Sequence, residues 1–132
     1  KPQMNADKRR LDINNITEQI LGCSYKVSNT LGCGFLEKVY ENALVHELRK
    51  TGLQVKQQYR ITVYYDGVVV GEYVADLLVE ECVLVELKAI RNLTEIDRAQ
   101  CLNVIKATKL KICLLINFGT PRIEIKRVVQ NF

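Results

Sequence analysis

The fold is decided by two short stretches, Glu72-Tyr-Val-Ala-Asp76 and Leu84-Val-Glu-Leu-Lys-Ala-Ile90. Both are apolar segments with isolated charges, and we expect two strands joined by a short turn. Strand alternation places Glu86 and Lys88 on one face of the second strand and the residues around them on the other. Asp76 ends the first strand near this Glu-x-Lys, so two acids and a lysine converge. Burying such groups is costly unless they are paired, hydrogen-bonded or bound to a metal, which marks a candidate site.

Two helices are expected before these strands. Apolar residues recur at helical spacing over residues 13–31, and the glycines of 32–34 end that helix. A second helix is expected over residues 35–50, and Tyr40 lies on its apolar stripe. We therefore interpret Tyr40 as a core residue rather than a catalytic one.

The middle of the chain is rich in β-forming residues. Asp66-Gly67 is typical of a tight hairpin turn, so residues 55–65 and the run that begins at Val68 are expected to pair. Glu80-Glu81 predicts the next turn, and residues 82–90 form the third strand. Connections this short indicate an antiparallel meander.

A helix and two further strands complete the expected order. Thr94 can cap a helix over residues 94–108. Its inward side is expected to hold Ile96, Ala99, Leu102 or Val104, and Ile105. Residues 111–117 are almost entirely apolar and predict a covered strand, which a right-handed crossover would lay parallel to a meander strand. Residues 122–129 predict a last strand at an edge. The order ααβββαββ indicates an α/β layered fold with a mixed central sheet.

Composition agrees with one globular domain. The chain has 132 residues, 48% hydrophobic and 26% charged, so we expect a flexible segment over residues 1–12 and a single domain over 13–132. No apolar run approaches the roughly 20 residues of a membrane helix, and no signal-peptide core is present. The odd number of cysteines and the lone histidine disfavour a disulfide framework or a zinc site, and favour a reducing cytoplasm. The five cysteines are Cys23, Cys33, Cys82, Cys101 and Cys113.

A Glu-x-Lys in a strand is by itself a weak signal, because alternating charges are common on solvated strand faces. The added acid, Asp76, points to phosphodiester chemistry. Carboxylates suit Mg²⁺, which binds one or two of them together with substrate phosphate and water. The metal would activate a water and offset phosphate charge, and Lys88 beside it could stabilise the developing negative charge or position the water.

The pattern also resembles a known family. Asp76 followed by Glu86-Leu-Lys88 is similar to the signature of the PD-(D/E)XK phosphodiesterase superfamily, which has the restriction-endonuclease-like fold. More narrowly, Gly34-Phe-Leu-Glu37-Lys-Val-Tyr40 resembles the signature of small bacterial and archaeal proteins called the GxxExxY family. The likeness extends over about residues 13–129. It implies an αβββαβ nuclease core, which agrees with the strand order above.

The resemblance implies a metal site. Asp76 and Glu86 would be ligands, and the carbonyl oxygen of Leu87 would be a third. Glu37, on the helix before the meander, would be an additional acid that reaches the metal directly or through water. The metal would be Mg²⁺ or Mn²⁺.

Two further residues receive roles from the resemblance. Lys88 would be the catalytic lysine, and Gln100, on the following helix, would orient Lys88 or the substrate. The sequence departs from the pattern at Ala75, where the superfamily's name has proline, and at Val104, where some branches carry tyrosine. The second departure weakens a comparison with recombination-type exonucleases.

We therefore expect a divalent-metal-dependent nuclease acting on nucleic acid, with DNA as the favoured substrate, no membrane association, and a homodimer or larger homo-oligomer. The alternatives are a catalytically silent nuclease-fold module that binds nucleic acid and a self-assembling structural protein. The net charge of +4 permits contact with nucleic acid without requiring it. Basic residues that could line a phosphate-binding surface, or form only a solvated face, are Arg91, Arg98, Lys106 and Lys109.

Overall fold

The computed structural model describes residues 6–130. Residues 1–5, part of the segment predicted to be flexible, lie outside the described residues, and the backbone of residues 6–12 is helical. The helices are α1 (Ala6–Leu31), α2 (Glu37–Lys50) and α3 (Glu95–Thr108). The strands are β1 (Val55–Tyr65), β2 (Val68–Val79), β3 (Val83–Lys88), β4 (Ile112–Asn117) and β5 (Glu124–Val129). This is the predicted order ααβββαββ.

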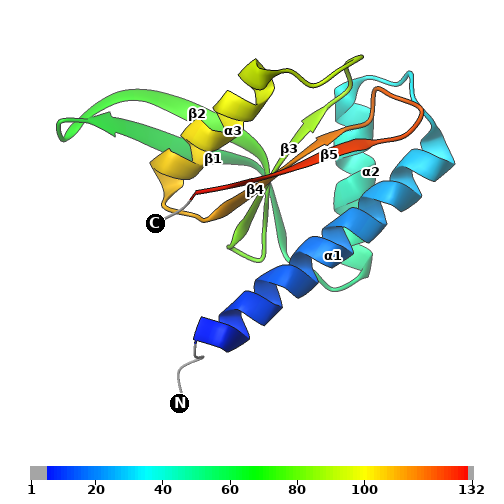
Figure 1. The fold of residues 1–132 in the computed structure, drawn as a ribbon, viewed down its shortest axis with the longest axis horizontal. Helices are drawn as coiled ribbons and strands as arrows, with labels where there is room; N and C mark the ends of the chain where they lie inside the picture. Colours follow the sequence, from blue (N-terminus) through cyan, green and yellow to red (C-terminus); the bar gives the residue numbers. More distant parts are fainter. Residues whose placement is uncertain (1–5, 131–132) are drawn as a thin grey trace.

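The five strands form one mixed sheet in the order β1-β2-β3-β4-β5. Neighbouring strands are antiparallel except β3 and β4, which the crossover through α3 makes parallel, as predicted. β2 pairs with β3 only over Leu77–Val79, so most of the β1–β2 hairpin projects beyond the rest of the sheet (Figure 1). Strands β1 and β5 are the two edges.

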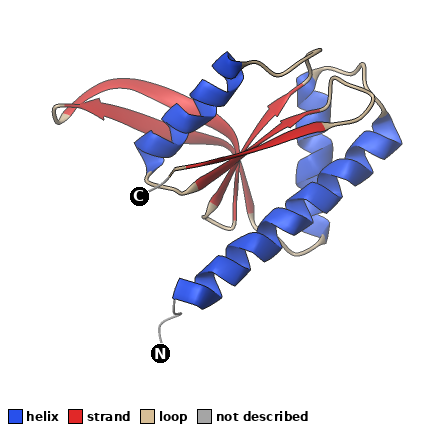
Figure 2. Cartoon of the chain, in the orientation of Figure 1, coloured by secondary structure: helices blue, strands red, loops and turns tan. Residues whose placement is uncertain are grey.

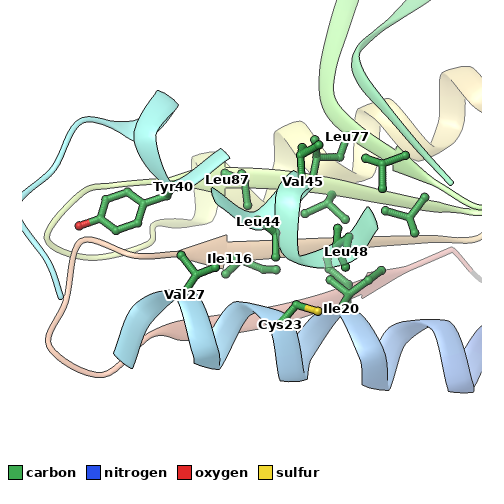
Figure 3. Close-up of a cluster of buried hydrophobic side chains, with 14 of the residues drawn as sticks. Ile20, Cys23, Val27, Tyr40, Leu44, Val45, Leu48, Leu77, Leu87 and Ile116 are labelled. Carbon is green, nitrogen blue, oxygen red and sulfur yellow. The ribbon is translucent and has the colours of Figure 1, made fainter. Parts of the chain in front are cut away.

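Helices cover both faces of the sheet, which gives three layers (Figure 2). Helices α1 and α2 pack on one face, and α3 packs on the other. We call the two hydrophobic clusters the α1/α2 core and the α3 core. Figure 3 shows the α1/α2 core, where Ile20 and Leu44 of the helices meet Leu87 and Ile116 of the sheet. Each fully buried side chain of this size contributes about 1.5–3 kcal/mol.

The predicted inward side of α3 is right for Val104 and Ile105 and wrong for Ile96 and Ala99. Ile96 is 71% exposed and Ala99 is also exposed, whereas Cys101, Val104 and Ile105 are buried against the sheet. At 3.6 residues per turn, Ile96 and Ala99 lie on the side of the helix away from Cys101. Polar and apolar residues are mixed around α3, so its sequence does not reveal which side of the helix faces the sheet. Among residues 6–130, no helix has the length and apolar character needed to span a membrane.

The loop after β4 is packed tightly against the end of β3. Asn117 is fully buried, and its side chain bonds Ile90 in both directions: Nδ2 donates to the Ile90 carbonyl at 2.9 Å and Oδ1 accepts from the Ile90 N–H at 3.0 Å. The N–H of Phe118 donates to the carbonyl of Lys88 at 2.8 Å. Gly119 approaches so closely that a Cβ there would lie 2.2 Å from the Ile90 carbonyl oxygen.

Tyr40 is fully buried, as predicted, and links this loop to the start of α2. Its ring stacks on Phe118 with centroids 4.8 Å apart and planes at 8°. Its hydroxyl donates to the carbonyl of Gly32 at 2.6 Å and accepts from the N–H of Phe35 at 3.1 Å. The loop that leads into Glu37 is therefore fastened to the same place as the ends of β3 and β4.

Gly119→Ala should lower the free energy of unfolding by about 1–3 kcal/mol, because the new methyl overlaps backbone atoms of Ile90 that cannot move aside. Urea denaturation measures the effect. Gly71→Ala is the matched control, since a Cβ there meets nothing within 4 Å. Equal urea midpoints for the two variants would contradict the close packing of this loop.

Tyr40→Phe should lower the free energy of unfolding by about 1 kcal/mol, because the Gly32 carbonyl and the Phe35 N–H lose their shared partner while the ring stays packed. Thermal denaturation of this variant is compared with that of Tyr25→Phe, whose ring is 48% exposed. A variant as stable as the control would show that the hydroxyl does not hold the loop.

Candidate active site

The backbone pairing between β2 and β3 ends at Leu77 and Val85. Beyond this pair, the strands are joined by hydrogen bonds from backbone N–H groups to side-chain carboxylates. The N–H of Asp76 donates to Oε1 of Glu86 at 2.8 Å, and the N–H of Leu87 donates to Oδ2 of Asp76 at 2.7 Å. Each carboxylate thus accepts a backbone N–H from the opposite strand. We call this pair of bonds the Asp76–Glu86 crossing. It holds the two acids together where the strands separate.

Glu86 is almost completely buried, with 6% of its surface exposed. Its second oxygen, Oε2, accepts a hydrogen bond of 2.7 Å from the hydroxyl of Tyr73. The pKa of Glu86 is raised to about 7. Burial is the largest cause and the charge of Asp76 adds to it, whereas the hydrogen bond from the Tyr73 hydroxyl acts in the opposite direction. The hydrogen bonds therefore compensate only part of the cost of burying this carboxylate.

The other two candidate acids also have raised pKa values, although Asp76 is only partly buried and Glu37 is largely exposed. Burial raises the pKa of Asp76, while the hydrogen bond from Leu87 acts against it and the charge of Glu41 adds to it. Burial also raises the pKa of Glu37, and the charge of Asp76 raises it further. All three acids have raised pKa values, chiefly through loss of solvent, and the charge of Asp76 adds to the shift of the other two. Such a local environment favours a bound cation.

Lys88 is the cation near these acids. Its side chain is 28% exposed, and Nζ lies 3.8 Å from Oδ1 of Asp97 on α3. The charge of Lys88 lowers the pKa of each of the three acids, Glu37, Asp76 and Glu86. The structure thus brings four of the five predicted catalytic residues into one electrostatic neighbourhood.

Gln100 stands apart from this group. It is exposed on α3, and within the part of the chain that the structure describes no hydrogen bond involves its side chain. Asp97, one turn earlier, contacts Lys88 instead, and it also completes the capping box of Thr94. The role predicted for Gln100 stays a prediction. Arg91, Arg98, Lys106 and Lys109 are all exposed, and the phosphate-binding surface likewise stays a prediction.

Two residues of the site were missed in the sequence. Strict strand alternation separates Tyr73 from Asp76, so the bond between Tyr73 and Glu86 was not foreseen. Asp97 was not among the candidate site residues. Its position within a turn of Gln100, on the same helix, was the available signal for contact with Lys88.

The donor set suits a hard cation. Within residues 6–130, no group of three or more His, Cys, Asp and Glu side chains is arranged to hold a metal ion. Two carboxylates and a backbone carbonyl are nevertheless enough for Mg²⁺, which usually keeps several waters. Both oxygens of Glu86 and Oδ2 of Asp76 each use one lone pair for a backbone or hydroxyl donor and retain another. Asp76, Glu86 and the carbonyl of Leu87 therefore have the chemistry that the metal requires.

Comparison with known proteins places the chain in a family. None of the curated proteins matches it. Among solved structures it is similar to an alkaline exonuclease (LHK-Exo) from Laribacter hongkongensis, with 16% identity, a TM-score of 0.49, and coverage of 98% of this chain and 73% of the exonuclease. The family model described as the PD-(D/E)XK nuclease superfamily matches residues 14–128, and the chain belongs to that superfamily.

Proposed function

We propose that this chain is a divalent-metal-dependent nuclease that hydrolyses phosphodiester bonds in nucleic acid, with DNA as its substrate. The observation that carries the proposal is the Asp76–Glu86 crossing, with Lys88 close enough to act on both acids. Membership of the nuclease superfamily supports the same chemistry. Fold alone does not determine activity, so the argument depends on the site.

Asp76, Glu86 and the Leu87 carbonyl would hold Mg²⁺ or Mn²⁺, and Glu37 would act at the edge of the site. When bound, the metal lowers the pKa of a water and neutralises charge on the attacked phosphate. The chain's own groups prepare this site. Tyr73 holds one oxygen of Glu86 in place, and the backbone N–H groups of Asp76 and Leu87 fix the orientation of both carboxylates.

Lys88 would stabilise negative charge on the phosphate or position the attacking water. Its contact of 3.8 Å with Asp97 is longer than a direct hydrogen bond, so the ammonium group is restrained without being neutralised by a close partner. Its backbone is held by the bond from Phe118. Gln100 would reach Lys88 or the substrate only through a change of its exposed side chain.

A second candidate is a catalytically silent nuclease-fold module that binds nucleic acid. The observation in its favour is that, among the described residues, no three ionisable metal-binding side chains form a cluster. We place it second because the burial of Glu86 and Asp76 with raised pKa values has no other evident benefit.

Three narrower assignments belong to the proposal. Gly34, Glu37 and Tyr40 support placement in the GxxExxY branch. The five cysteines are free, which agrees with a reducing cytoplasm. The edge strands β1 and β5 offer unpaired backbone groups through which copies of the chain could form a homodimer or larger homo-oligomer.

Asp76→Ala and Lys88→Ala should each reduce DNA cleavage at least about 100-fold, because each removes a group that acts on the reacting phosphate or its metal. The assay incubates plasmid, linear and single-stranded DNA, and RNA, with Mg²⁺ or Mn²⁺. Lys126→Ala, an exposed residue on β5, is the matched control and should cleave like the wild type.

The substrates separate the alternatives. Binding without cleavage by the wild type would favour the silent module. Neither binding nor cleavage, together with concentration-dependent assembly, would favour a structural protein. If the wild type cleaves RNA and none of the DNA substrates, RNA replaces DNA as the proposed substrate.

Mn²⁺ should stabilise the wild-type fold without any nucleic acid present. At about 100 times its dissociation constant, one bound ion should raise the free energy of unfolding by about 2.7 kcal/mol, since it binds the folded state only. Thermal denaturation with and without Mn²⁺ measures this, and Asp76→Asn should abolish the difference. Glu72→Gln, at an exposed position on β2, should respond like the wild type. An equal response of both variants would place the metal elsewhere.

A further inference from the structure

Gln58 has an unusual backbone for a strand residue. Its φ is +57°, in the left-handed region that glycine favours, although it lies in the middle of β1. The neighbouring pairs Gln57–Leu77 and Tyr59–Ala75 are in register, and the ladder is interrupted between them. The residue opposite Gln58 at this interruption is Asp76. Strain of this kind is retained where the surrounding structure imposes it, commonly at functional sites.

At this interruption, side chains that would be expected on one face of the hairpin move to the other face. On β1, Val55 packs in the α1/α2 core and Ile61 in the α3 core, although an even spacing would place them on one face. On β2, Leu77 and Ala75 are separated in the same way. The left-handed turn of the backbone at Gln58 accompanies this exchange. It leaves Asp76 at the point where the face changes.

The side chain of Gln58 is anchored on a buried acid. Nε2 lies 3.1 and 3.0 Å from the two carboxylate oxygens of Glu41, which is 1% exposed. Glu41 also accepts from Nε2 of Gln57 at 2.6 Å and from Nζ of Lys38 at 3.0 Å. Gln58 also stands opposite Asp76 in the strand pairing, between the pairs Gln57–Leu77 and Tyr59–Ala75. Its side chain is among the influences that lower the pKa of Asp76, whereas the charge of Glu41 raises it. Gln58 thus lies between the two acids.

We propose that Gln58 is a positioning residue whose carboxamide, anchored on Glu41, fixes the carboxylate of Asp76 at the crossing and separates it from the charge of Glu41. This inference rests on the proposed nuclease function. It assigns the strained backbone a purpose, since the left-handed residue stands opposite Asp76 while its amide bonds Glu41. Neither Gln58 nor Glu41 was a candidate in the sequence.

Gln58→Gly is the decisive variant, because glycine adopts the left-handed conformation without strain but carries no amide. Its thermal midpoint should fall no further than that of Gln57→Ala, because relief of the backbone strain offsets part of the loss of the amide from Glu41. Its kcat for DNA cleavage should fall about 10- to 100-fold with little change in KM, since a displaced carboxylate impairs the chemical step. Its affinity for Mn²⁺ alone, measured by electron paramagnetic resonance of the free ion, should fall at least about threefold.

Gln57→Ala is the matched control. It removes the other glutamine amide from Glu41, at a residue with ordinary strand pairing, and should lose stability while keeping kcat and the Mn²⁺ affinity. Gln58→Asn tolerates the backbone and retains a shorter amide, so its kcat should lie between those of the wild type and Gln58→Gly. Should Gln58→Gly prove unstable, Gln58→Asn supplies the comparison.

The results distinguish this inference from the proposed function. A wild type that neither cleaves nucleic acid nor binds Mn²⁺ would overturn both. An active wild type whose kcat and Mn²⁺ affinity are unchanged in Gln58→Gly would overturn the positioning role alone. Losses of kcat and Mn²⁺ affinity of the same size in Gln57→Ala would also overturn it, because they would indicate that removing any amide from Glu41 has this effect.

Discussion

Two backbone N–H groups that bond to carboxylates instead of strand carbonyls determine the arrangement of this molecule. A regular antiparallel ladder would continue past the Leu77–Val85 pair. At the Asp76–Glu86 crossing, each strand gives its N–H to the acid of the other, so the ladder ends without leaving these donors unsatisfied. The projecting hairpin, the burial of both acids and the position of Lys88 all follow from that ending.

The surrounding structure keeps this arrangement rigid. Phe118 bonds the backbone of Lys88 and stacks on Tyr40, and Tyr40 in turn fastens the loop that leads to Glu37. Asn117 holds the chain just after β3. Residues from three separate parts of the sequence thus support one short strand end. A site that holds two poorly solvated carboxylates benefits from such support. Loosening would let water solvate them or a lysine pair with them, and their orientation would be lost.

The fold was predictable because its signals are local. The Asp66-Gly67 turn, the apolar run 111–117 and the spacing of the helices gave the order and the parallel pair of strands. The site was predictable from the residues themselves where they are close along the chain, as for Glu86 and Lys88, or one turn apart, as for Asp76. Glu37 was indicated by the family resemblance. Tyr73 and Gln58 could not be found, because one left-handed residue changes the face of both strands and defeats alternation. The contact between Asp97 of α3 and Lys88 depends on how α3 is rotated about its axis, and the composition of the helix does not determine that rotation.

The spacing of Glu-x-Lys has a physical reason that alternation alone does not supply. Glu86 and Lys88 share a face because one residue separates them, and that residue is Leu87. Leu87 packs its side chain into the α1/α2 core on the opposite face and gives its N–H to Asp76. The hydrophobic core therefore fixes the depth and rotation of the strand at the point where the charges emerge. A residue that packed poorly at position 87 would displace Glu86, Lys88 and the N–H group that bonds Asp76. Leu87 is therefore as much a part of the site as the charged residues on either side of it.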